Sequence, residues 1–120
     1  MKKCILVVDD DSMNLARTKT ILGKEYEVLL AESGIQALKM LKNTRVDMVL
    51  LDIDMPEMDG LETFERMKGI TSGIPVFFLT ASGLEEDVIS AIRLGAVNYL
   101  KKPYRPQELL KRIAQEFEKQ

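Results

Sequence analysis

The sequence predicts an α/β protein in which one parallel sheet of five strands lies between two layers of helices. Short continuous apolar runs, typical of strands buried on both faces, alternate along the chain with segments whose apolar residues recur at helical spacing. Five strands alternating with five helices imply right-handed crossovers, and hence a parallel sheet covered by helices on both faces. The 120 residues are enough for one ordinary domain, and we expect 1–120 to form a single domain.

Each strand is predicted from an apolar run. The expected strands are 4–8, 26–31, 47–51, 75–79 and 97–100. The second is the most polar, because Glu25 and Glu27 flank or enter it, and this favours a place at the sheet edge. Pro75 is tolerated as the first residue of its strand. The pattern leaves the strand order open; a flavodoxin-like order, 2-1-3-4-5, would fit a polar second strand at the edge.

Each helix is predicted from apolar residues at helical spacing together with residues typical of helix ends. Helices are expected to begin at Ser12 or Asp11, Ser33-Gly34, Asp59 and Pro106. They are expected to end at Gly23, at the glycines that bound 69–73 and at Gly95. The periodic apolar positions are Leu15, Thr18, Ile21 and Leu22, then Ala37, Leu38 and Leu41, then Leu61, Phe64 and Met67, then Val88, Ala91, Ile92 and Leu94, and finally Leu109, Leu110, Ile113 and Phe117.

Composition excludes several classes of function. Lys and Arg number 17 and Asp and Glu 19, so the net charge of −2 gives no reason to expect contact with nucleic acid or an anionic membrane. No apolar run approaches the roughly 20 residues of a membrane span, and the N-terminal run is too short for a signal peptide. Cys4 has no partner and is expected to be a small buried hydrophobe in a reducing compartment. We therefore expect a cytoplasmic protein.

Polar residues follow four of the five predicted strands. Asp9 and Asp10 follow the first, Asp52 the third, Thr80 the fourth and Lys102 the fifth. Each has an ordinary explanation alone, as a helix cap, a turn residue, a strand end or a surface charge. In a parallel sheet, however, the carboxyl ends of the strands share one rim, and ligands bind outside that rim. Their convergence predicts a ligand site there.

The predicted chemistry of this rim is phosphoryl transfer. Three crowded carboxylates repel one another, so their pKa values rise unless a cation binds. Hard oxygen ligands suit Mg²⁺, with Mn²⁺ able to substitute, whereas the lack of His and the single Cys exclude zinc. A carboxylate beside such a metal can accept a phosphoryl group as an aspartyl phosphate. The ammonium and the metal would neutralise developing charge, and the hydroxyl could hydrogen-bond a phosphoryl oxygen.

The motifs resemble those of the receiver domain of bacterial two-component response regulators, over essentially all 120 residues. They are Val7-Val8-Asp9-Asp10-Asp11, Leu50-Leu51-Asp52, Met55-Pro56-Glu57-Met58-Asp59-Gly60, Leu79-Thr80-Ala81 and Tyr99-Leu100-Lys101-Lys102-Pro103. This ordered set is highly specific. The resemblance implies the flavodoxin-like strand order 2-1-3-4-5.

The resemblance also implies a role for each acidic residue of the rim. Asp52 matches the phosphoacceptor. Asp10 matches a direct Mg²⁺ ligand, and Asp9 matches its neighbour, which acts largely through metal-bound water. The backbone carbonyl of Asp54 would be the third protein ligand. The Asp54 carboxylate is acidic where the family is variable, so it either faces the phosphoryl group and alters the decay of the aspartyl phosphate or points into solvent without effect.

The remaining matches concern the conformational switch. Thr80 matches the hydroxyl that moves toward the phosphoryl group, and Tyr99 the aromatic residue whose inward or outward rotamer reports that movement. Lys102 matches the lysine that pairs with phosphoryl oxygens. The resemblance also implies a cis bond between Lys102 and Pro103, an arrangement that costs only about 0.5–1 kcal/mol relative to trans.

The implied function is phosphorelay signalling. A sensor histidine kinase or a histidine phosphotransfer protein would donate the phosphoryl group, and the face made by the fourth helix, fifth strand and fifth helix would change shape. That face would act on a downstream output protein or a covalently linked output domain, and it would allow a homodimer. The domain would promote only its own phosphorylation and slow dephosphorylation, so we do not expect an enzyme.

Two alternatives remain at this point. Asp52-Ile53-Asp54 resembles the Asp-x-Asp pair of haloacid dehalogenase-like phosphatases. In those proteins the motif usually follows the first strand, whereas here it follows the third and leaves Asp9 and Asp10 unexplained. The second alternative is a receiver-like interaction module that works without phosphorylation, and the complete set of rim residues argues against it.

Overall fold

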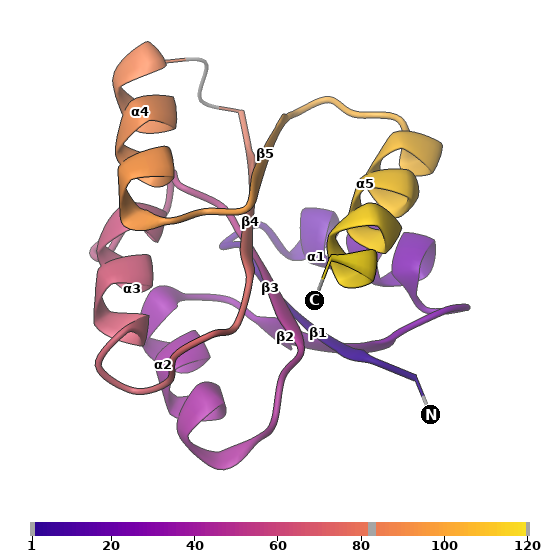
Figure 1. Ribbon diagram of the computed structural model, residues 1–120, viewed down its shortest axis with the longest axis horizontal. Coiled ribbons are helices and arrows are strands. Elements are labelled where there is room, and N and C mark those ends of the chain that lie inside the picture. Colours follow the sequence, from indigo (N-terminus) through magenta and orange to yellow (C-terminus); the bar gives the residue numbers. More distant parts are fainter. Residues whose placement is uncertain (1, 82–83, 120) are drawn as a thin grey trace.

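The computed structural model describes residues 2–81 and 84–119, and Figure 1 shows its course. The strands are β1 (Cys4–Val8), β2 (Glu27–Ala31), β3 (Met48–Leu51), β4 (Val76–Thr80) and β5 (Asn98–Lys101). The helices are α1 (Ser12–Leu22), α2 (Gly34–Asn43), α3 (Gly60–Met67), α4 (Glu85–Leu94) and α5 (Pro106–Glu118). All strand pairs are parallel and the order is β2-β1-β3-β4-β5, as predicted. The polar β2 lies at the edge.

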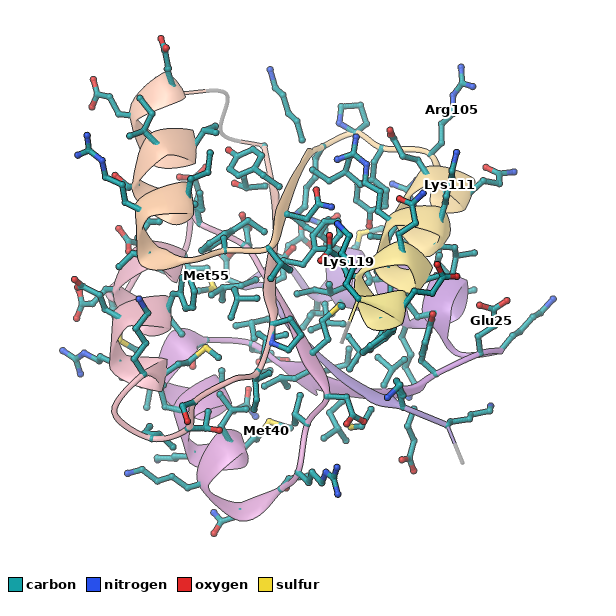
Figure 2. All side chains as sticks on the ribbon, in the orientation of Figure 1. Glu25, Met40, Met55, Arg105, Lys111 and Lys119 are labelled. Atoms are coloured by element: carbon teal, nitrogen blue, oxygen red, sulfur yellow. The ribbon has the colours of Figure 1, made fainter. Side chains whose placement is uncertain are left out.

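The sheet separates two helix layers and two cores; Figure 2 draws the side chains on the ribbon. In Figure 1, α1 and α5 lie on one side of the sheet, and α2, α3 and α4 lie on the other. Successive side chains of a strand point to opposite faces. Accordingly, Ile5 and Val7 of β1 enter the core under α1 and α5, while Leu6 and Val8 enter the other. A strand buried on both faces has no polar alternation, which is why these runs are continuously apolar.

The register brings the ends of β1, β3, β4 and β5 to one rim. Val8 of β1 is level with Leu51 of β3, so the residues that follow them leave the sheet together. The backbone N–H of Asp52 donates to the Val8 carbonyl at 3.0 Å. At the same rim, between β4 and β5, the N–H of Lys102 donates to the Thr80 carbonyl at 2.9 Å.

The predicted element boundaries need small corrections. β2, β3, β4 and β5 each begin one residue later than expected, and β4 and β5 each extend one residue further. Tyr26 falls outside β2 because its N–H donates to the Leu22 carbonyl in the turn that ends α1. Thr80 belongs to β4 because it pairs with Lys101. A run of apolar letters cannot show these hydrogen bonds.

The helix ends follow the predicted chemistry. Of the two candidate caps for α1, Asp11 is the one used, and its carboxylate accepts from the N–H groups of Met13 and Asn14. Ser33 and Asp59 cap α2 and α3 in the same way. Gly95 ends α4 with φ 100°, a left-handed conformation that favours glycine.

Two further expectations, that Cys4 is buried and that Ile92 faces the core, were met only in part or not at all. Cys4 is half-buried rather than buried, because β1 begins at the surface, and burial still raises the pKa of its thiol. Ile92, one of the periodic positions of α4, is 64% exposed. Ser82 and Gly83, which follow β4 in the sequence, lie outside the described residues. Among the residues that are described, no helix is long and apolar enough to cross a membrane.

Candidate functional site

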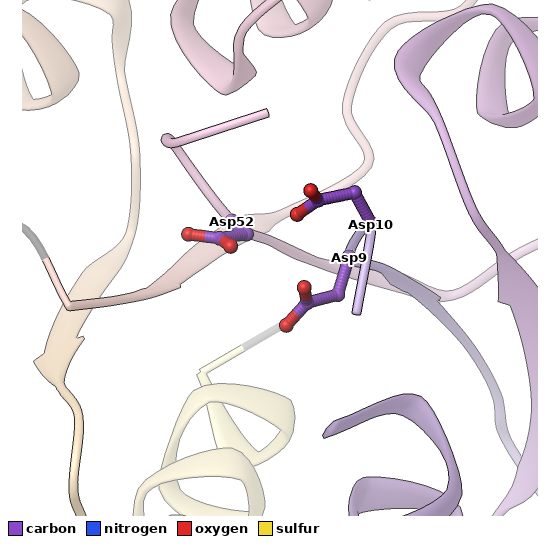
Figure 3. A group of neighbouring side chains, drawn as sticks. All are labelled: Asp9, Asp10 and Asp52. Atoms are coloured by element: carbon purple, nitrogen blue, oxygen red, sulfur yellow. The ribbon is translucent and has the colours of Figure 1, made fainter. Parts of the chain in front are cut away.

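Three carboxylates gather at the rim formed by the strand ends. Asp9 and Asp10 follow β1 and Asp52 follows β3, and one oxygen of each lies within 4.8 Å of the others (Figure 3). Asp9 is 5% exposed and Asp52 7%, whereas Asp10 is exposed. The cluster therefore has two carboxylates held in the protein and one at the solvent side.

The backbone around the cluster fixes the two buried carboxylates. Oδ1 of Asp9 accepts from the N–H of Asp11 at 3.0 Å, and Oδ1 of Asp52 accepts from the N–H of Asp54 at 3.3 Å. These bonds arise locally, because each carboxylate reaches the N–H two residues further along the chain. They orient the carboxylates.

Lys102 brings a positive charge into the cluster. Its Nζ lies 2.7 Å from Oδ2 of Asp9 and 3.7 Å from Oδ2 of Asp52. Burial alone would lower the pKa of this ammonium, but the hydrogen bond to Asp9 and the charges of Asp52 and Asp9 outweigh burial and raise it. Lys102 is therefore charged at neutral pH. The bond to Pro103, which follows it, is cis as predicted.

Asp52 is the carboxylate whose ionisation the site disfavours. Burial raises the pKa of Asp52 from its ordinary value of 3.8 to about 6, and the charge of Asp9 adds to this rise. The Lys102 charge, the Thr80 hydroxyl and the Asp54 N–H act in the opposite direction. Loss of solvent prevails because so little of the side chain reaches water.

Thr80 contacts this carboxylate, and Tyr99 lies on the neighbouring strand β5, level with Phe78 of β4. Thr80 is fully buried and its hydroxyl hydrogen-bonds the Asp52 carboxylate. The half-buried Tyr99 packs its ring against Phe78, with 6.5 Å between ring centroids. Arg112 of α5 donates to the Tyr99 carbonyl at 3.2 Å. The inward or outward movement of these side chains stays a prediction.

The side chain of Asp54 is exposed, while its backbone contacts Asp52 through the N–H bond described above. The backbone of this residue therefore belongs to the site. The effect of its carboxylate on the lifetime of an aspartyl phosphate stays a prediction.

The donor set fits a hard divalent cation. All three side chains offer carboxylate oxygens, and they are close enough to share one ion. Burial raises the pKa of Asp52, so the site disfavours its negative charge, and a bound cation would offset that penalty. Among the described residues this is the one group of three acidic or metal-binding side chains gathered in this way.

The chain matches the family described as the response regulator receiver domain over residues 5–114. This chain is a response regulator receiver domain. The match covers more than nine-tenths of the sequence and includes every candidate residue of the rim. Receiver domains bind Mg²⁺ at an aspartate cluster, and the cluster of this one is formed by Asp9, Asp10 and Asp52.

Curated relatives of this receiver domain are response regulators. It is 42% identical over 100 residues to the transcriptional regulatory protein ZraR of Escherichia coli K12, covering 82% of this chain and 23% of ZraR. It is 37% identical over 115 residues to the DNA-binding response regulator MtrA of Mycobacterium tuberculosis H37Rv, covering 94% of this chain and 50% of MtrA. The receiver domain thus spans half or less of the length of these relatives.

Solved structures agree over nearly the whole chain. A CheY-like receiver domain protein from Methanospirillum hungatei JF-1 has a TM-score of 0.94 at 32% identity, covering 99% of this chain and 96% of that one. Chemotaxis protein CheY4 of Vibrio cholerae has a TM-score of 0.88 at 30% identity, and the match covers 96% of this chain and 98% of CheY4. The BeF3-activated DrrB receiver domain has a TM-score of 0.89 at 29% identity, and the match covers 98% of this chain and 99% of the DrrB domain.

Sequence reasoning missed the packing that supports the site. A Cβ at Gly60 would overlap the backbone carbonyl of Asp52, so only glycine allows α3 to begin this close to Asp52. Tyr104, after the cis bond, places its hydroxyl 3.3 Å from that of Thr18. Arg17 lies over the Tyr104 ring, 5.6 Å from its centroid. The Asp-Gly motif signalled the first of these, whereas nothing in the local sequence signalled the contacts of Tyr104.

Proposed function

We propose that Asp52 accepts a phosphoryl group from a phosphohistidine of a sensor histidine kinase or a histidine phosphotransfer protein, in a Mg²⁺-dependent reaction. The observation that carries the proposal is the surroundings of Asp52. Its buried carboxylate meets two further carboxylates, the Lys102 ammonium and the Thr80 hydroxyl at the end of β4. A residue that only ended a strand would not need these charged and polar neighbours.

Asp9, Asp10 and Asp52 would hold the ion, with the backbone carbonyl of Asp54 as a further ligand. When bound, Mg²⁺ supplies positive charge that offsets the negative charge of the reacting oxygens. An oxygen of Asp52 forms the new bond to phosphorus while the bond from phosphorus to the imidazole nitrogen breaks, and the nitrogen keeps the electron pair. Lys102, already 3.7 Å from Asp52, stabilises the added oxygens by charge.

We infer that the new phosphoryl group acts on the rest of the domain through Thr80, Lys102 and Tyr99. The Thr80 hydroxyl and the Lys102 ammonium contact phosphoryl oxygens, and the Tyr99 ring takes its inward position. These residues belong to β4, β5 and the loop after β5, so the α4–β5–α5 face changes shape. Phosphorylation need only shift an existing equilibrium by a few kcal/mol to do this.

The output response would be produced by a linked output domain or a separate output protein. ZraR is described as a transcriptional regulatory protein and MtrA as DNA-binding. We propose that this domain signals to an output domain or output protein through the α4–β5–α5 face, without contacting nucleic acid itself, and that it works in the cytoplasm as a signalling module rather than an enzyme. A homodimer through the same face is part of this proposal.

The decisive experiment is phosphorylation by acetyl phosphate with Mg²⁺, followed by intact-protein mass spectrometry. The wild type should gain one phosphoryl mass, and Asp52→Ala should gain none. Asp54→Asn, altered two residues away on an exposed side chain, should still be modified. If Asp52→Ala gains the same mass as the wild type, Asp52 is not the acceptor.

The alternatives predict other results. A haloacid dehalogenase-like phosphatase would turn over small phosphate esters many times, whereas a receiver shows only slow loss of its own phosphoryl group. A module that works without phosphorylation would respond neither to Mg²⁺ nor to beryllium fluoride. The family match supports the receiver over the phosphatase.

A further inference from the structure

A cavity opens between α3 and α4, at the edge of the sheet where β4 begins. Its volume is about 500 Å³, within the range of small-molecule sites. β4 leads from this edge to Thr80 at the aspartate cluster. At about 3.3 Å per residue, five residues place the two roughly 16 Å apart. The cavity is therefore separate from the proposed phosphorylation site.

The walls of the cavity are largely apolar. Phe64 and Met67 of α3, Leu94 of α4 and Val97 before β5 form much of its lining. Gly73 also lines it; with φ 81° it has a conformation that favours glycine, and a Cβ there would meet nothing within 4 Å. Such walls suit the hydrocarbon part of a ligand.

Lys68 gives the cavity a positive charge. Among the described lining residues it is the one with a charged side chain; Thr71 and Ser72 add hydroxyl groups. Its Nζ lies 5.2 Å from the centroid of the Phe64 ring, so the ammonium stands against the apolar wall. Within the described part of the chain, no carboxylate forms an ion pair with Lys68. The charge is available to an anion.

We propose that the α3–α4 cavity binds a small amphipathic carboxylate, with its hydrocarbon part between α3 and α4 and its carboxylate paired with Lys68. One ammonium matches one negative charge, which favours a monoanion over a phosphate dianion. An apolar pocket with a few placed polar groups is the usual composition of a small-molecule site. This site lies at the opposite edge of the sheet from Asp52 and needs no phosphoryl transfer.

The bound carboxylate is also coupled to the conformational switch of Thr80 and Tyr99, and this part of the proposal rests on the proposed function. A ligand in the cavity contacts Phe64, whose ring centroid lies 5.9 Å from that of Phe78. Phe78 in turn packs on Tyr99. If the carboxylate binds one state of α4 better, phosphorylation must change its affinity, and the ligand must change the affinity of the phosphoryl analogue by the same factor.

The test is a titration of the ¹⁵N-labelled protein with octanoate below its micelle concentration. The amide signals of Gly73 and Gly95, which line the cavity, should shift and saturate. Those of Gly23 and Gly34, which lie elsewhere, should not. Octanamide, the neutral analogue, should bind about fivefold more weakly than octanoate, the effect of one exposed charge. Failure of Gly73 and Gly95 to shift, or equal affinities for the two ligands, overturns the proposal.

Two variants and a control locate the interaction. Lys68→Met removes the ammonium and should weaken octanoate binding about fivefold while leaving octanamide unchanged. Thr71→Phe should fill the cavity and abolish binding of both. Lys39→Met removes the charge of another exposed lysine, on α2, and should bind both ligands as the wild type does. Equal octanoate affinity in Lys68→Met and Lys39→Met contradicts the assigned role of Lys68.

The linkage is tested by repeating the octanoate titration with Mg²⁺ and beryllium fluoride. A changed affinity supports the linkage, and an unchanged one refutes it while the binding site stands. If beryllium fluoride leaves the amide signals around Asp52 where they were, the failure is that of the proposed phosphorylation function instead.

Discussion

Replacing Asp52 with Asn should stabilise the metal-free protein. The side chain keeps its shape, but the charge that burial disfavours is gone. The pKa of Asp52 rises from 3.8 to about 6 on folding, and each tenfold change in proton affinity is worth about 1.4 kcal/mol. Keeping Asp52 ionised therefore reduces the free energy of unfolding by about 3 kcal/mol.

The effect has a defined pH dependence. Because the folded pKa of Asp52 is raised, the folded protein binds more protons than the unfolded chain between pH 3.8 and about 6. The wild type thus loses stability as the pH rises through this window, and the loss is complete above it. The stabilisation by Asp52→Asn should be about 3 kcal/mol at pH 7.5 and only about 1 kcal/mol at pH 4.5.

Urea unfolding in EDTA at these two pH values measures the difference. Asp54→Asn is the matched control, because it removes the same charge from an exposed side chain two residues away and should change stability by less than about 0.5 kcal/mol. If Asp52→Asn is no more stable than the wild type at pH 7.5, or if its advantage is the same at both pH values, burial does not raise this pKa as argued.

Four further results are expected. Mg²⁺ should raise the midpoint of urea unfolding of the wild type but much less that of Asp52→Asn, since only the former keeps all three carboxylates; equal rises would place the ion elsewhere. Lys102→Met should increase Mg²⁺ affinity by about tenfold or more, measured by calorimetry, because it removes a charge 2.7 Å from Asp9. Gly60→Ala should lower the free energy of unfolding by more than about 2 kcal/mol, because its Cβ meets backbone, whereas Gly69→Ala, with room for a Cβ, should be far milder. Asp54→Asn should change the decay rate of the aspartyl phosphate; equal decay in both proteins across pH would show that its exposed carboxylate has no role.

The sequence by itself determined the order and type of the elements. Strands buried on both faces require continuous apolar runs, and helix caps require particular residues such as Ser33 and Asp59. Because these requirements are local, they can be recognised from the sequence. The sequence also placed Asp9, Asp52 and Lys102 at strand ends. For a parallel sheet this is enough to predict that they converge.

Only the tertiary structure decided which contacts these converging side chains make. The sequence does not show that Lys102 pairs more closely with Asp9 than with Asp52, nor that the Thr80 hydroxyl hydrogen-bonds the Asp52 carboxylate. Those contacts depend on the register between strands far apart in sequence, which local pattern does not encode. The cavity beside Lys68 has the same origin, because it exists only where α3 and α4 pack against the start of β4. Electrostatics and cavity shape depend on distances in space, and only the folded chain sets those distances.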